Sequence, residues 1–260
     1  MKKLWYRFFI FLTNHKASSM MLMKFSQSKL SRGIIPSYDR LYKLNWEDVE
    51  KERGDFNTLH DLFTRKLKTG VRNVNQEKNT VVSPVDAVYE DYGVIQSDSN
   101  IVVKGKGYSI QEMLGDDAVL EKYLGGQYMI LYLSPSHYHR IHSPVEGEVV
   151  KRWSLGKLSY PVNKLGLKYG KSTLSKNFRV ITEIKHAFGY LSVVKVGAMF
   201  VNSIEITNDS DKLQKGEEVA YFSFGSTVVL LFEKDTFELK QDLQASSEVK
   251  YGEVLGYLKQ

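Results

Sequence analysis

Residues 224–232 read Phe-Gly-Ser-Thr-Val-Val-Leu-Leu-Phe, and this stretch is the strongest indication of the fold. Thr227 to Phe232 is an unbroken run of apolar and β-branched residues, which is typical of a strand buried on both faces. Gly225 and Ser226 stand directly in front of that run. Because glycine has no Cβ, it permits a tight turn at this point. We therefore expect a buried strand that begins at a glycine-containing turn.

Short runs of the same character recur after Gly70 and are separated by turn residues. The clearest are Val81-Val82, Tyr128 to Leu133, Glu148 to Val150, and Leu191 to Val196. Glycines at positions 93, 105, 107, 147, 156, 166, 170 and 216 lie between the candidate strands. Such frequent punctuation favours short strands that turn back on one another. The sequence therefore predicts a mostly antiparallel β body.

The chain in front of this body has a helical pattern. Between Tyr38 and about Lys68, apolar residues recur at three-to-four-residue spacing, first at Leu41, Leu44 and Trp46 and then at Leu59, Leu62 and Phe63. Phe56-Asn57-Thr58 supplies a cap for the second helix. The polar stretch 73–80 connects the segment with the helical pattern to the segment with the strand pattern. We predict an α+β fold, with a helical region at 1–75 and a β-rich body at 76–260.

Charge and apolar residues near the N-terminus indicate a membrane surface. Residues 1–75 hold fifteen Lys and Arg against seven Asp and Glu, although the whole chain carries a net charge of only +6. Residues 4–12 read LWYRFFIFL, which is too short to span a bilayer, since a transmembrane helix needs about 20 apolar residues. An interfacial helix fits this pattern better than a helix docked on the core or a signal peptide. A nucleic-acid partner is not expected.

Composition restricts the chemistry. With 42% hydrophobic residues, the 260-residue chain can bury a substantial core. It has no cysteine, which excludes disulfides, thiolate metal sites and thiol nucleophiles. Any covalent catalysis must therefore use other groups.

Three stretches in the sequence together suggest a family. They are Ser83-Pro84-Val85-Asp86, then Leu133 to Pro144, which contains Tyr138-His139-Arg140-Ile141-His142, and then Phe224-Gly225-Ser226-Thr227. In this order they resemble the phosphatidylserine decarboxylase family, whose marks are a Pro-x-Asp turn, a Tyr-His-Arg-x-His segment and a Leu-Gly-Ser-Thr processing site. The resemblance extends through 63–68, 196–198 and 215–218 and covers roughly residues 55–235. Phe224 departs from it, standing where leucine is usual.

The resemblance implies a self-processing enzyme. The chain would cut itself between Gly225 and Ser226 into a β chain, 1–225, and an α chain, 226–260, which stay associated. Ser226 would become a covalent pyruvoyl group, the only cofactor. Asp86 and His142 would activate Ser226 as a relay used once, and His139 would lie by the substrate carboxylate or by the carbanion that follows decarboxylation.

The residues themselves agree with this chemistry. A serine hydroxyl after glycine can attack the preceding carbonyl once a base removes its proton, and histidine is the natural base because its pKa lies near neutrality. The resulting ester can undergo β-elimination, and the dehydroalanine hydrolyses to a ketoacyl group. That ketone would capture the amine of phosphatidylserine as a Schiff base, act as an electron sink for loss of carbon dioxide, and release phosphatidylethanolamine. We expect a peripheral protein of the cell membrane, on its cytoplasmic face, acting on phosphatidylserine in an anionic membrane. A homo-oligomer is compatible with the sequence.

Three other readings remain open at this stage. A zinc hydrolase could use His137, His139 and His142, with Asp86 completing the site; on a strand, 137 and 139 would share a face. A non-catalytic lipid-surface protein would keep the fold and never cleave. A processed family member acting on a soluble amino acid would have no need for the basic, aromatic N-terminus.

Overall fold

The structure is a computed structural model that describes residues 16–103, 105–160, 162, 172–198 and 203–259. Residues 4–12, the predicted interfacial segment, lie outside the described residues. Across the described ranges, no helix is both long and apolar enough to cross a membrane. The fold combines helices with antiparallel sheets and is rich in strand, as the sequence predicts.

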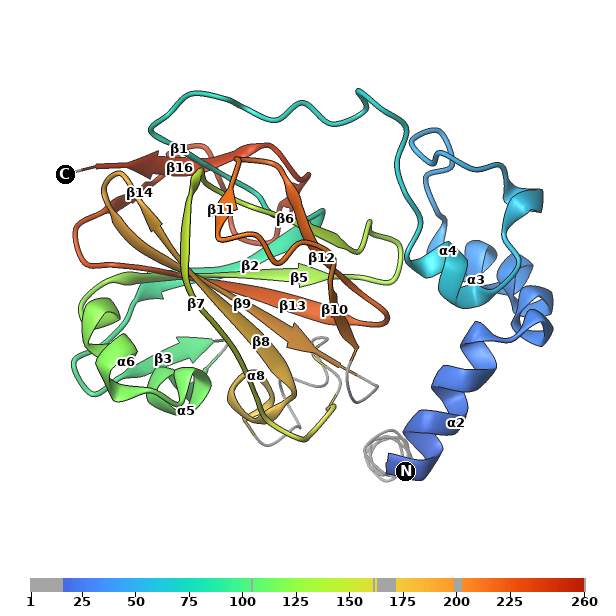
Figure 1. The fold of residues 1–260 in the computed structure, drawn as a ribbon, viewed down its shortest axis with the longest axis horizontal. Coiled ribbons are helices and arrows are strands. Elements are labelled where there is room, and N and C mark those ends of the chain that lie inside the picture. Colours follow the sequence, from blue (N-terminus) through green and yellow to red (C-terminus); the bar gives the residue numbers. More distant parts are fainter. Residues whose placement is uncertain (1–15, 104, 161, 163–171, 199–202, 260) are drawn as a thin grey trace.

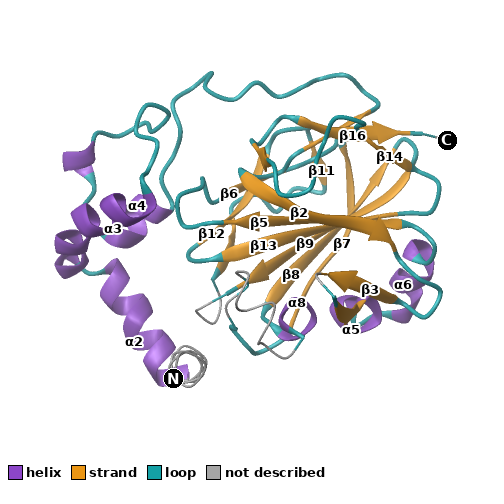
Figure 2. Cartoon of the chain, turned by 180° about the vertical axis from the view of Figure 1, so that it is seen from behind, coloured by secondary structure: helices purple, strands orange, loops and turns teal. Residues whose placement is uncertain are grey.

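A helical region lies beyond one end of the β body (Figures 1 and 2). Its helices are α2 (Lys16–Gln27), the 3-10 helix η1 (Lys29–Ile34), α3 (Ile35–Tyr42), the 3-10 helix η2 (Arg53–Asp55) and α4 (Leu59–Phe63). They enclose a small core of their own, made of Ile35, Leu44, Val49, Phe56 and Leu62. The predicted cap is confirmed, because the Thr58 hydroxyl accepts a hydrogen bond from the Asp61 amide at 2.9 Å.

The expected helical stretch from Tyr38 to Lys68 is only partly correct. α3 ends where Lys43 adopts a left-handed backbone conformation, with φ of 51°. The chain then runs mostly without helix to residue 58, and Val49 forms an isolated antiparallel bridge with Leu67. Apolar spacing alone suggested a helix here, but these residues pack as irregular chain. The division at residue 75 stays a prediction, although helices precede residue 64 and the first strand starts at Thr80.

The described residues of the β body form one central sheet of eight strands, ordered β11-β7-β8-β9-β13-β5-β2-β15. In chain order these strands are β2 (Ala87–Val94), β5 (Gln127–Leu133), β7 (Gly147–Leu155), β8 (Arg179–His186), β9 (Gly189–Gly197), β11 (Lys212–Leu213), β13 (Ser226–Phe232) and β15 (Glu248–Val249). Every pairing in this sheet is antiparallel. The predicted strands at 128–133, 148–150, 191–196 and 227–232 are all present.

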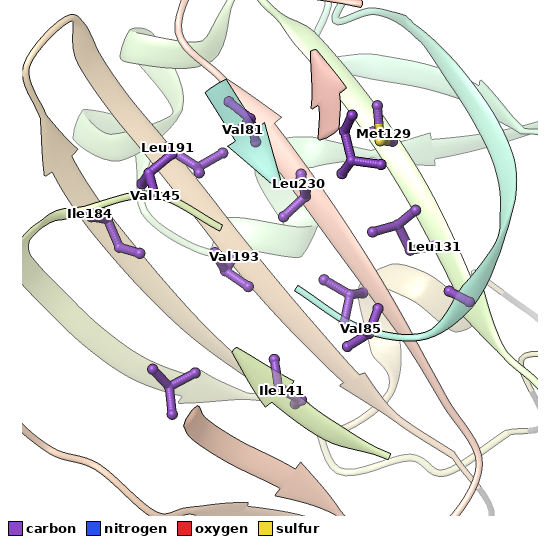
Figure 3. Close-up of a cluster of buried hydrophobic side chains, with 14 of the residues drawn as sticks. Val81, Val85, Met129, Leu131, Ile141, Val145, Ile184, Leu191, Val193 and Leu230 are labelled. Atoms are coloured by element: carbon purple, nitrogen blue, oxygen red, sulfur yellow. The ribbon is translucent and has the colours of Figure 1, made fainter. Parts of the chain in front are cut away.

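β13 is buried on both faces, as the apolar run predicts. Val228, Leu230 and Phe232 belong to one core cluster, whereas Val229 and Leu231 belong to a second cluster behind the sheet. Side chains alternate between the faces of a strand. Figure 3 shows part of the first cluster, with Leu230 of β13 close to Met129 and Leu131 of β5. By the same alternation, Ser226 faces the first cluster.

Two smaller sheets cover that first face, and a hairpin and short helices cover the other (Figure 1). One small sheet has the order β1-β16-β14 and the other β10-β12-β6, and β3 pairs with β4. These strands are β1 (Thr80–Val82), β3 (Asn100–Val103), β4 (Lys106–Ser109), β6 (Arg140–His142), β10 (Ile204–Ile206), β12 (Glu218–Phe222), β14 (Phe237–Leu239) and β16 (Val254–Leu258). The helices α5 (Ile110–Leu114), α6 (Asp117–Tyr123) and α8 (Thr173–Lys176) were not predicted, because they are too short for a helical period to show.

Candidate active site

Strand register brings distant sequence motifs to one edge of the central sheet. Ser226, the first residue of β13, pairs with Leu133 at the end of β5 and with Gly197 at the end of β9. β2 begins at Ala87 and pairs with the same end of β5, so Asp86 precedes it at this edge. The turn 134–138 leaves β5 there and leads to His139 and His142. The three motifs of the sequence therefore gather around the start of β13.

Ser226 is completely buried, and its hydroxyl has no hydrogen-bond partner within the described residues. An unsatisfied buried hydroxyl is unusual and calls for an explanation. Gly225, by contrast, has no steric need to be glycine in this uncut chain: its φ is not left-handed, and an added Cβ would meet nothing within 4 Å. The chain bends at residues 223–224 before β13, and this bend does not depend on a conformation that only glycine can adopt at position 225.

Burial favours the neutral form of His142, and the neighbours of the ring fix which nitrogen carries the proton. Its Nδ1 lies 2.9 Å from the Gly216 carbonyl, and because a carbonyl only accepts, Nδ1 carries the proton. Its Nε2 is then free to accept from the Tyr138 hydroxyl at 3.3 Å. Burial lowers the pKa of His142 below its ordinary value of 6.5, although the Gly216 carbonyl and the charges of Glu218 and Asp86 oppose this. The imidazole is therefore ready to take up a proton.

Asp86 is buried, and its carboxylate is directed to partners other than His142. Arg72 donates to it twice, from Nε to Oδ1 at 3.1 Å and from Nη2 to Oδ2 at 2.5 Å. The amide of Tyr251 also donates to Oδ1, at 2.8 Å. In the described part of the chain, Asp86 makes no hydrogen bond to His142 or Ser226. The structure thus brings the predicted relay residues to one region without joining them by hydrogen bonds.

His139 is fully buried beside the cleavage sequence. Its Nδ1 donates to the carbonyl of His137 at 2.9 Å, which leaves Nε2 as an acceptor. Nε2 is buried, and no described residue bonds to it. Burial, reinforced by the charge of Arg65, puts the pKa of His139 well below its ordinary value. The ring of Phe63, at the end of α4, lies 3.8 Å from the imidazole and 5.0 Å from the ring of Phe224. The helical region therefore packs against both His139 and the segment before Ser226.

The three histidines do not form a metal cluster. His137 lies in the turn after β5, not on a strand, so the expected shared face with His139 is wrong. The Nδ1 of His137 accepts from the Ser134 amide at 3.1 Å, whereas His139 and His142 bond to separate carbonyls. Among the described residues, no group of three His, Asp or Glu side chains is placed to hold a metal ion. This arrangement gives the zinc hydrolase reading no support.

A cavity of about 440 Å³ opens between the helical region and the β body, next to Asp86. Its wall includes Arg65, Arg72, Asp86, His137 and Tyr138. Arg65 is buried and holds the turn after β5, since its Nη2 donates to the carbonyls of Ser136 and His137 at 2.6 and 2.8 Å. The cavity lies within the size range of small-molecule sites.

Two residues at this site were not found from the sequence. Arg72 had no distinguishing mark among fifteen basic residues in the first 75. Tyr251 lies far along the chain, and its ring stacks on the His142 imidazole with 3.8 Å between the ring centroids and 5° between the planes. β15 runs antiparallel to β2 with Val249 opposite Ala87, so the chain that follows β15 passes Asp86.

Comparison with known proteins places this site in a family. A sequence model described as phosphatidylserine decarboxylase matches residues 59–257. The chain belongs to the phosphatidylserine decarboxylase family. It is 60% identical over 259 residues to a protein of Geobacillus sp. (strain WCH70), covering 100% of both chains. It is 58% identical to a protein of Anoxybacillus flavithermus (100% of this chain, 98% of the relative) and 54% identical to one of Geobacillus kaustophilus (99% and 97%). Each relative is named phosphatidylserine decarboxylase proenzyme.

The segment matched to the phosphatidylserine decarboxylase family contains every residue predicted to act. Asp86, His139, His142 and Ser226 all lie within 59–257. So do Phe63 and Arg72, which contact two of them. The family resemblance inferred from the motifs is thereby confirmed.

Proposed function

We propose that this chain cuts itself between Gly225 and Ser226 and then decarboxylates phosphatidylserine to phosphatidylethanolamine. The observation that carries the proposal is the Ser226 hydroxyl, which is buried at the start of the central strand and has no hydrogen-bond partner among the residues that the structure describes. A side chain that is consumed during maturation needs no permanent partner. The names of the relatives add support, because each is called a decarboxylase and a proenzyme.

His142 is the proposed base for self-cleavage. Its Nε2 carries the lone pair that would take the Ser226 proton. In the uncut chain that lone pair accepts a hydrogen bond from the Tyr138 hydroxyl, which must give way first. Once His142 accepts a proton, the imidazolium is stabilised by the Gly216 carbonyl and by the nearby charges of Glu218 and Asp86. Asp86 would act on His142 through its charge in the conformation seen here, and through a direct bond only if its carboxylate turns.

Ser226 fits the proposed pyruvoyl group, because the residue lies at the start of a strand that is paired on both sides. A pyruvoyl group supplies a carbonyl that withdraws electrons from the substrate as carbon dioxide leaves. His139 would handle the proton of the decarboxylation step. Its Nε2 is buried close to the cleavage sequence and has no partner within the described ranges, and the Nδ1 contact with His137 fixes the direction of the ring.

The two fragments are expected to stay together after cleavage. The α chain would begin with β13, which lies between β5 and β9 of the β chain. Seven residue pairs join β13 to each of these neighbours. β16 pairs with β1, and β15 pairs with β2, so the rest of the α chain is also held by the β chain. Cutting one peptide bond removes none of these ladders.

The helical region supports the proposal of a peripheral membrane protein. α2 and η1 leave large apolar side chains exposed, namely Met20, Met21, Leu22, Phe25 and Leu30, of which Met21 is 70% and Leu30 81% exposed. Lys24 and Lys29 lie among them. Exposed apolar side chains mixed with lysine suit the headgroup layer of an anionic leaflet, such as the cytoplasmic one. A family member acting on a soluble amino acid would gain nothing from this surface.

The direct test is release of carbon dioxide from phosphatidylserine vesicles. The wild-type chain should release it, and Ser226→Ala should release none because no pyruvoyl group can form. His139→Gln should still mature but decarboxylate much more slowly. Activity of Ser226→Ala equal to that of the wild type would refute the proposal.

Sedimentation with vesicles tests the proposed membrane-binding surface of α2 and η1. Removal of residues 1–15 together with Met21→Ser and Leu30→Ser should weaken binding to anionic vesicles.

A further inference from the structure

Arg72 makes the most extensive ionic contacts near the proposed site. Its guanidinium donates to both oxygens of Asp86, at 3.1 and 2.5 Å, and its Nη1 donates to Asp48 at 2.8 Å and to the Val71 carbonyl at 3.0 Å. The side chain of Arg72 is only 7% exposed, and that of Asp86 only 10%. A planar guanidinium that grips both oxygens of a carboxylate fixes the orientation of that carboxylate.

The charge balance explains why this buried cation is stable. Burial alone would lower the pKa of Arg72, but its hydrogen bonds and charge interactions with Asp86 and Asp48 raise it overall. Removing one partner of a buried ion pair leaves the other as an uncompensated charge. Asp86 therefore depends on Arg72 for charge compensation and for the fixed orientation of its carboxylate.

Tyr251 connects Asp86 to His142, because it contacts both residues. The Tyr251 amide donates to Asp86 Oδ1 at 2.8 Å, and the Tyr251 ring stacks face to face on His142. A carboxylate held in place therefore fixes the backbone that carries the stacking ring. Tyr251 would belong to the α chain, whereas Arg72, Asp86 and His142 would belong to the β chain. The contacts form one continuous path from Arg72 to the proposed base.

We propose that Arg72 is a positioning residue for self-cleavage, which holds Asp86 and through it the orientation of His142. This inference rests on the proposed function, because it assumes that Asp86 and His142 serve the cleavage of Gly225-Ser226. Arg72 touches neither reacting atom. Arg72 also contacts Asp48, which lies in the helical region. The packing of the helical region is therefore linked to the position of Asp86.

The test is chemical rescue of the full-length chain. Arg72→Ala, made by cell-free synthesis, should convert to two fragments about 10-fold to 100-fold more slowly than the wild type, the range expected for loss of charge-assisted hydrogen bonds. Millimolar guanidinium in the buffer should restore much of the rate, because the ion can occupy the vacated space beside Asp86. Urea has the same shape without the charge and should restore nothing.

Matched controls separate this inference from the proposed function. Arg40→Ala removes an exposed arginine of α3 and should cleave at the wild-type rate with or without guanidinium. If Arg72→Ala does not fold, Arg72→Lys keeps the charge without the two-oxygen grip and should cleave several-fold more slowly. Wild-type cleavage by either variant, or equal rescue by urea, would overturn the role of Arg72. Wild-type cleavage by Asp86→Asn would instead refute the relay itself.

Discussion

Phe63 offers a sharp test of how the helical region serves the site. Its ring is 2% exposed and lies against both His139 and Phe224. Phe63→Ala should cost about 3–5 kcal/mol of stability, the usual range for a buried phenylalanine, of which each ring pair contributes about 0.5–1.5 kcal/mol. It should leave self-cleavage in place, since no hydrogen bond of His142 or Asp86 is touched. Decarboxylation should fall about 10-fold or more, because His139 loses the ring that packs on it.

The control is a second phenylalanine with the same burial and no contact with the site. Phe56 is 1% exposed and packs edge-on against Trp46, 5.9 Å away, in the core of the helical region. Phe56→Ala should lower the thermal midpoint by a similar amount, yet the folded, matured enzyme should keep its turnover. Turnover is measured as carbon dioxide released from phosphatidylserine per matured chain. If both variants lose stability equally and both keep full turnover, the reasoning about Phe63 is refuted.

Three further predictions follow from single residues. Tyr251→Leu should slow self-cleavage about 3-fold to 10-fold on a denaturing gel, whereas Tyr251→Phe, which keeps the stacking ring on His142, should match the wild type. Self-cleavage should speed up with rising pH as His142 loses its proton. Because burial lowers the pKa of that histidine, the midpoint of the rate profile should lie below pH 6.5, and a higher midpoint would contradict this. Burial lowers the pKa of Lys195 from an ordinary 10.5 to about 7. Between pH 7 and pH 10.5 the unfolded chain therefore keeps a proton on Lys195 that the folded chain has released. The free energy of unfolding should rise with pH across that range, because the unfolded state binds more protons there. Lys195→Met should abolish that rise in thermal unfolding scans, and an unchanged rise would exclude Lys195 as its source.

The strands could be predicted because their side chains report burial directly. Tyr128 to Leu133 and Thr227 to Phe232 are apolar at nearly every position, and both lie in the middle of the central sheet. The helical period was less reliable. It correctly indicated α3 and α4 but also suggested helix between residues 43 and 58, where irregular chain packs its apolar residues instead. Spacing alone did not reveal the helices α5, α6 and α8, which have four to seven residues. The five-residue α4 was indicated by its Thr58 cap as well as by its apolar spacing.

The site was predictable as a set of motifs but not as a set of contacts. Asp86, His142 and Ser226 could be named because the three motifs recur together in one family. The partners of Asp86 could not, since Tyr251 is 165 residues away along the chain and reaches it only through the pairing of β15 with β2. Likewise, nothing in the sequence shows that the His142 Nδ1 would bond to the Gly216 carbonyl. Such contacts depend on tertiary placement.

The intact mass of purified, active enzyme shows whether the chain cuts itself between Gly225 and Ser226. Self-cleavage should give two polypeptides, residues 1–225 and a partner of 35 residues that begins with a keto group in place of the Ser226 amine. Ser226→Ala and His142→Ala should each give one uncut chain. Active enzyme consisting of a single polypeptide of 260 residues would show that maturation by self-cleavage does not occur.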